Sequence, residues 1–299
     1  MIKYAYIVEC DIGGYAIDIP VSITHFVKQP KFLPVNKIIR SRDFTVNHLS
    51  ENALISEDDE TITPSNFRTV LDYMTRCILL SDDHTFDLAN IMLKRYLDQK
   101  LITADDVAET FDKELMLNQV PEKISNIDDI PDEAFDLATD IYAWEIAYRI
   151  GNYVVPTQYP DQITVQHMKL MMKRIENFFN EYGWPTGDAF GASTKNGYLS
   201  GDDDYLLKNT LVDLKASNKT TIQIFWVSQL LLYYTLVFLN HLNDEKIDRL
   251  MIYNARADMI FYADMADIDD SVFEYVNDAA EKQSLVNEKL IKQMMGELN

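Results

Sequence analysis

Short β-prone runs near the start of the chain give way to longer runs with helical spacing. Residues 4–8 and 15–19 lie on either side of Gly13-Gly14, a dipeptide typical of hairpin turns. A helix is predicted from Ser65, because apolar positions recur there at helical spacing. These positions are Phe67, Val70, Leu71, Met74 and Ile78.

Later segments continue the alternation of helices and strands. Further helices are predicted within residues 84–117, where Thr103 and Asp106 are typical of a helix cap, and then at 133–151 and 164–182. The segments 196–217 and 249–265 have the short apolar runs of strands, and an amphipathic helix is predicted after them.

This order predicts an α/β fold with a small central mixed sheet flanked by helices, preceded by an N-terminal β and helical extension. Residues 121–131 form a polar, acidic connection bounded by prolines, which we take as a domain boundary. The predicted domains are therefore residues 1–120 and 121–299.

The segment 220–242 is predicted to be a long apolar helix. Residues 220–239 contain no charged side chain, so a membrane span is an alternative. Gln223, Ser228 and Gln229 near its middle favour a buried helix over a span, because polar groups are costly in lipid.

Composition narrows the classes of function. The formal net charge of −21 argues against a protein that coats DNA without sequence preference, because an acidic surface repels nucleic acid unless a local groove or metal ions offset it. It leaves room for a basic protein partner. Only Cys10 and Cys77 are present, so no disulfide framework is expected and a cytoplasmic location is predicted.

The stretch from Gly201 to Ser217 has the pattern of a β-hairpin. If Lys208-Asn209 forms a tight loop, Leu207 faces Thr210 and Asp204 faces Asp213. Strand alternation then places Asp213 and Lys215 on one face.

Two opposed carboxylates repel each other unless a cation lies between them. Oxygen ligands favour Mg²⁺ or Mn²⁺, and a lysine beside such an ion could orient or deprotonate an attacking water. This pattern is suited to hydrolysis of a phosphodiester bond.

These motifs resemble the PD-(D/E)XK nuclease superfamily, in particular its RecB-like and Cas4-like branch. In that branch a Gly-x-x-Asp turn precedes a strand with Asp/Glu-x-Lys, and Gln-x-x-x-Tyr lies on the next helix. This chain has Gly201-x-x-Asp204, Asp213-Leu-Lys215 and Gln229-x-x-x-Tyr233 in that order.

The resemblance implies a restriction-endonuclease-like core in residues 121–299 and Mg²⁺- or Mn²⁺-dependent cleavage of DNA in bacterial or phage repair, recombination or defence. It implies catalytic roles for Asp204, Asp213, Lys215, Gln229 and Tyr233. It also implies an upstream acidic metal ligand, for which Glu145 is the first choice and Asp140 the alternative.

Other interpretations of these residues stay open. The superfamily includes inactive members, so the chain could be an acidic binding or inhibitor protein with a nuclease fold. Gln229 and Tyr233 could be polar core residues, and Glu145 could lie on a solvated helix face. Arg256, which follows a predicted strand, could contact a phosphate or form a surface salt bridge. Oligomeric state and the role of residues 1–120 do not follow from the pattern.

Overall fold

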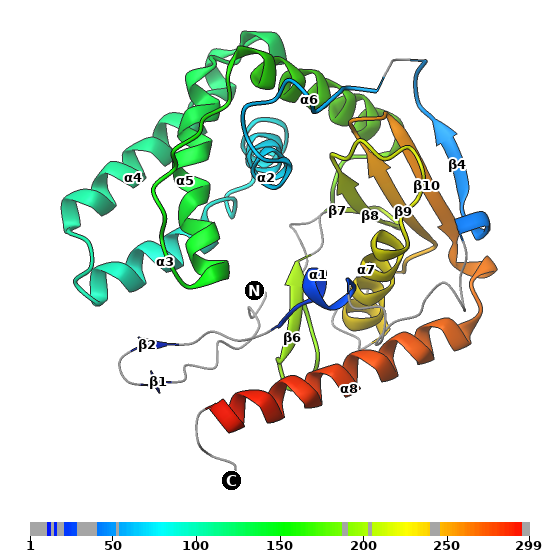
Figure 1. The fold of residues 1–299 in the computed structure, drawn as a ribbon. Helices are drawn as coiled ribbons and strands as arrows, with labels where there is room; N and C mark the ends of the chain where they lie inside the picture. The colour runs from blue at the N-terminus through cyan, green and yellow to red at the C-terminus, as the bar shows by residue number, and fades with distance from the viewer. Residues whose placement is uncertain are drawn as a thin grey trace.

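The computed structural model describes residues 11–12, 15–16, 21–28, 41–51, 54–186, 191–202, 205–239 and 246–294 (Figure 1). Its strands are β1 (Asp11–Ile12), β2 (Tyr15–Ala16), β3 (Val21–Ser22), β4 (Thr45–His48), β5 (Gly191–Ser193), β6 (Leu199–Asp202), β7 (Tyr205–Leu207), β8 (Thr210–Lys215), β9 (Arg249–Asn254) and β10 (Met259–Asp264). Its α-helices are α1 (Ile23–Phe26), α2 (Pro64–Met74), α3 (Asp87–Asp98), α4 (Ala104–Asn118), α5 (Glu133–Ile150), α6 (Gln162–Tyr182), α7 (Ile224–Tyr234) and α8 (Asp270–Met294).

A mixed five-stranded sheet with the order β4-β10-β9-β8-β7 lies at the centre. β8 and β9 are parallel, whereas the other neighbouring strands are antiparallel. The connection between β8 and β9 passes through α7, as a parallel pair requires. Helices cover the sheet, so the predicted α/β class is confirmed.

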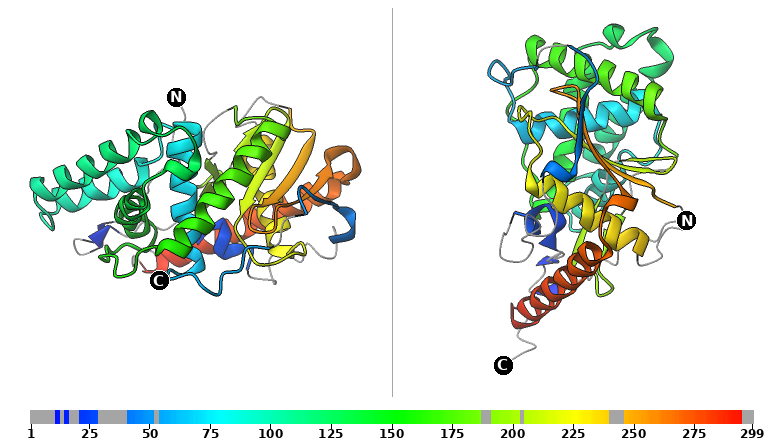
Figure 2. Two further views of the ribbon diagram at one scale, coloured as in Figure 1. Left: turned by 90° about the horizontal axis from the view of Figure 1, so that it is seen from above. Right: turned by 90° about the vertical axis from the view of Figure 1, so that its right-hand side faces the viewer.

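The two faces of the sheet pack against different helices. Val212 and Leu214 of β8 belong to a buried cluster that includes residues of α2, α5 and α6. Leu211 of the same strand belongs to a second cluster, which includes residues of α1, α7 and α8. Figure 2 shows the α2–α6 layer on one side of the sheet and α7 and α8 on the other. β8 is therefore buried on both faces.

Local signals account for several element ends. Thr103 caps α4 by accepting a hydrogen bond from the Asp106 backbone, and the Asp106 carboxylate accepts one from the Thr103 backbone N–H. α5 ends at Gly151, which has a φ of 76° that glycine adopts without strain. β1 and β2 form the hairpin predicted around Gly13-Gly14; residues 4–8 lie outside the described ranges.

The predicted helix at residues 220–242 begins later than expected. α7 starts at Ile224, and a π-helical turn, Thr235–Leu239, follows it. Residues 240–242 of the predicted helix lie outside the described ranges. Asn254 donates hydrogen bonds to the carbonyls of Ser217 and Lys219 and holds this stretch in a turn, which delays the helix. No helix in the described ranges is long and apolar enough to cross a membrane.

The predicted boundary near residue 120 stays a prediction. One buried cluster contains Leu117 and Val120 from one side of it and Ile127 and Ala134 from the other. β4 of the first region also pairs with β10 of the second. The first region thus contributes the edge strand of the central sheet.

Glu114 links α4 to α3 and predicts a pH effect. Its carboxylate accepts a hydrogen bond of 3.3 Å from Asn90, and burial raises its pKa from the usual 4.5 to about 7. Because the folded pKa is raised, the protonated form favours folding. Its contribution to stability is full below about pH 4.5 and is lost as the pH rises to about 7.

We therefore expect Glu114→Gln to flatten the fall in stability across this pH range and to be the more stable form at pH 8. Urea unfolding between pH 4 and pH 8 measures this. Glu122→Gln, the same change at an exposed glutamate, is the control. Parallel stability curves for wild type and Glu114→Gln would contradict the prediction.

Candidate active site

The β7–β8 hairpin has the register expected from the sequence. Tyr205 pairs with Val212, and Leu207 pairs with Thr210. The turn uses Lys208 with a φ of 43°, a left-handed conformation common in tight hairpins. Asp204, which this register was predicted to set opposite Asp213, lies outside the described residues.

Asp213 and Lys215 form a buried ion pair on the face of β8 that α7 covers. The Lys215 Nζ lies 2.5 Å from the Asp213 Oδ1, and the two side chains are only 5% and 1% exposed. β9 pairs with β8 along its whole length, including Asp213 and Lys215, whereas β7 pairs with β8 only up to Val212. Water therefore screens this charge pair much less than it would at the surface.

Two polar residues of α7 extend the pair into a chain of hydrogen bonds. Lys215 donates to the Gln229 Oε1 at 3.2 Å, and the Gln229 Nε2 donates to the Tyr233 hydroxyl at 3.0 Å. Gln229 and Tyr233 are buried and four positions apart, so they lie on one side of α7. Gln229 of the second motif thus contacts Lys215 of the first, and Tyr233 joins the chain through Gln229.

Gly201, the first residue of the predicted turn motif, lies against the same group. A Cβ atom at this position would be 3.1 Å from the Ile23 Cβ and 3.3 Å from the Tyr233 Cε1. Both distances are tighter than ordinary van der Waals contact, and the Ile23 Cβ is held by backbone. Glycine is therefore needed here for close approach of β6 to α1 and α7.

We expect Gly201→Ala to destabilise the protein by about 1–3 kcal/mol, because overpacking forces neighbouring side chains out of position. Urea unfolding measures the loss. Ser200→Ala on the same strand is the control and should have a small effect. The expectation fails if Gly201→Ala is as stable as the wild type.

The two candidates for an upstream metal ligand lie in different surroundings. Glu145 of α5 is buried and accepts a hydrogen bond of 2.7 Å from the Tyr73 hydroxyl. Tyr73 belongs to the cluster on the other face of the sheet from Leu211. Glu145 therefore does not lie on a solvated helix face. Its role as a metal ligand stays a prediction.

Asp140, the alternative, already has two partners. It forms an ion pair of 2.8 Å with Lys113 and accepts a hydrogen bond of 2.6 Å from the Tyr159 hydroxyl. That hydrogen bond raises the pKa of Tyr159 to about 12. Both contacts tie α5 to α4 and to the loop before α6, which is a structural role.

Three residues that contact candidate site residues had no signal in the sequence. The Thr24 Oγ1 lies 3.5 Å from the Gln229 Nε2, Tyr73 binds Glu145, and Asn254 pairs with Lys215 across β8 and β9. Asn254 also holds the turn after β8 through its hydrogen bonds to the backbone. Each contact joins positions more than 30 residues apart, so local patterns could not reveal them.

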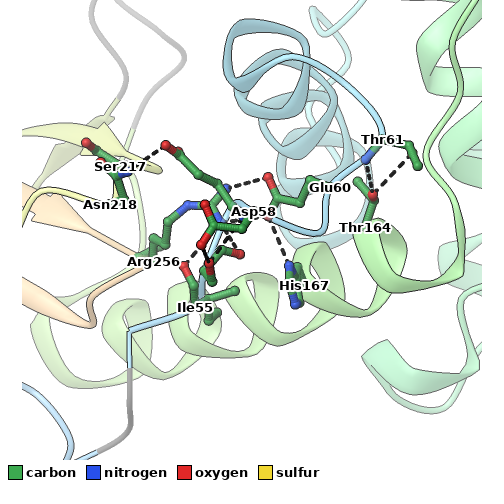
Figure 3. Close-up of polar contacts among 12 residues, drawn as sticks. Ile55, Asp58, Glu60, Thr61, Thr164, His167, Ser217, Asn218 and Arg256 are labelled. Atoms are coloured by element: carbon green, nitrogen blue, oxygen red, sulfur yellow. Dashed lines mark hydrogen bonds and ion pairs between the residues drawn. The ribbon is translucent and has the colours of Figure 1, made fainter.

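The sequence left two possible contacts for Arg256, a phosphate and a surface salt bridge, and the structure shows a different one. Its side chain is fully buried and pairs with Glu60 through two bonds of 2.6 and 3.0 Å (Figure 3). It also donates to the carbonyls of Ile55 and Ser56 and lies over the Phe67 ring. A guanidinium enclosed in this way is not placed for phosphate binding. It ties the β9–β10 turn to the segment before α2.

The predicted metal site stays a prediction. Asp213 provides one carboxylate, and the predicted second ligand, Asp204, lies outside the described ranges. Within those ranges, no three His, Cys, Asp or Glu side chains are close enough together to hold a metal ion. The oxygen chemistry of Asp213 fits Mg²⁺ or Mn²⁺, but a complete site requires Asp204 or another ligand outside the described residues.

The arrangement therefore has a lysine beside a carboxylate, oriented by an amide and a phenol. Such a lysine can donate hydrogen bonds to a phosphate oxygen or position a water molecule. Comparisons with models of protein families, with curated proteins and with solved structures gave no match.

Proposed function

We propose that this protein is a metal-dependent nuclease that hydrolyses DNA phosphodiester bonds, with its active site at Asp213 and Lys215. The observation that carries the proposal is the chain of contacts from Asp213 through Lys215 and Gln229 to Tyr233. It joins two separate motifs of the PD-(D/E)XK pattern in one place. If the Asp-x-Lys motif had arisen by chance, there would be no reason for Gln229 of the second motif to contact Lys215.

Each residue has a distinct role in this proposal. Asp213 and Asp204 would hold Mg²⁺ or Mn²⁺. The ion, when bound, activates water and offsets the charge that develops on the phosphate. Lys215 orients the attacking water or the phosphate oxygen. Gln229 holds the Lys215 ammonium in place, and Tyr233 fixes the Gln229 amide by accepting its hydrogen bond.

A second candidate is a catalytically inactive nuclease fold that serves as an acidic binding or inhibitor protein in the cytoplasm. The burial of the Asp213–Lys215 pair favours it, because a phosphate must reach side chains that are only 1% and 5% exposed. In this case the ion pair would be a core contact. The net charge of −21 would suit a basic partner.

A cleavage assay separates the two candidates. Purified protein is incubated with single- and double-stranded DNA in Mg²⁺, Mn²⁺ or EDTA. The nuclease proposal expects cleavage with either ion and none in EDTA. Thermal unfolding with and without Mg²⁺ adds a readout that does not depend on turnover, because an ion that binds the folded state raises the melting temperature. The absence of both effects would favour the inactive binding protein.

A further inference from the structure

α4 lies at the outer edge of the helical layer, well away from α7 (Figures 1 and 2). Its inner side packs on α3 and α5 through Thr110, Glu114 and Leu117, which are buried. Its outer side carries large apolar residues in solvent: Phe111 is 48% exposed, and Leu115 is 57% exposed.

Seven of the exposed residues of α4 form two parallel rows. Ala104, Ala108, Phe111 and Leu115 are separated by four, three and four positions, which places them in one apolar stripe. An exposed acidic residue follows each of the first three: Asp105, Glu109 and Asp112. The apolar stripe therefore has an acidic ridge along one side, and Met116, 55% exposed, extends the face near its C-terminal end.

The one basic residue of α4 offsets this ridge at Glu109 only. Lys113 lies 3.0 Å from Glu109 and 2.8 Å from Asp140, so two carboxylates share its charge. The outer face of α4 is consequently apolar and negative. An exposed apolar patch beside polar residues is typical of a surface that binds a partner.

We propose that this face of α4 binds a basic amphipathic helix of another protein. Leucine-like side chains of that helix would cover Phe111 and Leu115, while its lysines or arginines would pair with Asp105 and Asp112. The negative charge of this face of α4 disfavours other partners. A second copy would bring two acidic ridges together, and DNA or an anionic membrane would be repelled. The proposal does not rest on nuclease activity.

The test uses a labelled synthetic peptide of leucine and lysine with the length of α4, 15 residues, and its leucines at helical spacing. A peptide of equal composition with leucine and lysine in alternation is the first control, because it cannot form an apolar helical face. Fluorescence anisotropy with the full chain should show binding of the helical peptide that weakens as salt increases. The alternating peptide should bind at least about tenfold more weakly.

Variants locate the binding surface. Phe111→Ser/Leu115→Ser should lower the affinity about tenfold or more, and Asp105→Asn/Asp112→Asn should lower it several-fold. Matched controls lie on α8, where Leu285 and Leu290 are 59% and 54% exposed and Glu274 and Asp278 are exposed acids. Leu285→Ser/Leu290→Ser and Glu274→Gln/Asp278→Asn should leave the affinity unchanged.

Three results would overturn the proposal. Equal losses in the α4 and α8 variants would mean that the peptide binds by overall charge. A marked fall in melting temperature for Phe111→Ser/Leu115→Ser would mean that this chain itself covers the stripe. Sedimentation showing a dimer that this variant dissociates would make a second copy the occupant.

Discussion

Lys215→Gln and Asp213→Asn are each expected to lower Mg²⁺-dependent DNA cleavage by about 10²- to 10⁴-fold, the usual contribution of a group that assists proton transfer in the transition state. Lys215→Gln removes the ammonium that lies 2.5 Å from Asp213, and Asp213→Asn removes the carboxylate charge. Single-turnover cleavage of a labelled duplex measures the effect.

An exposed pair of the same residue types is the matched control. Lys246 and Asp248 lie 2.8 Å apart, and their side chains are 85% and 48% exposed. Lys246→Gln and Asp248→Asn change the net charge in the same way as the site variants. Both should cleave DNA at the wild-type rate. Equal losses in the two sets would point to general electrostatics and against a role for the buried pair.

The double variant Asp213→Asn/Lys215→Gln separates chemistry from folding. Each single variant leaves one buried charge without its ion-pair partner, which is destabilising, whereas the double variant removes both charges. We therefore expect stability to recover in the double variant and cleavage to stay low. Recovery of both would assign the pair a purely structural role and would mean that cleavage takes place elsewhere in the protein.

Arg256→Met is expected to destabilise the fold by about 3–5 kcal/mol, the usual cost of breaking a buried ion pair by removing one partner. Arg256 is 0% exposed and Glu60 is 1% exposed, so the Glu60 carboxylate would lose the guanidinium charge without access to solvent. The carbonyls of Ile55 and Ser56 would also lose a donor. Urea unfolding at pH 7 measures the free energy of unfolding.

Two comparisons test the cause of this loss. Arg256→Met/Glu60→Gln removes both charges and should recover part of the stability. Asp128→Asn breaks an exposed ion pair in which Lys173 and Asp128 are 39% and 67% exposed, and should change stability by less than about 1 kcal/mol. A comparable effect of Asp128→Asn and Arg256→Met would contradict a special role for burial.

The sequence by itself determined the features that depend on neighbouring residues. Strand alternation placed Asp213 and Lys215 on one face, and the two-residue turn at Lys208 and Asn209 determined the register of β7 and β8. The capping of α4 by Thr103 and the end of α5 at Gly151 could also be predicted, because capping uses side chains and backbone within one turn. The four-residue spacing of Gln229 and Tyr233 placed both on one side of a helix.

Only the tertiary structure decided which distant segments meet. Arg256 pairs with Glu60, which is 196 positions away in the chain. Residues near Arg256 in the sequence therefore could not distinguish a buried ion pair from a phosphate contact. The start of α7 depends on Asn254, which lies in a different strand and holds Ser217 and Lys219. Burial and charge pairing are set by the packing of segments that are far apart in sequence, whereas periodicity and turn chemistry are local.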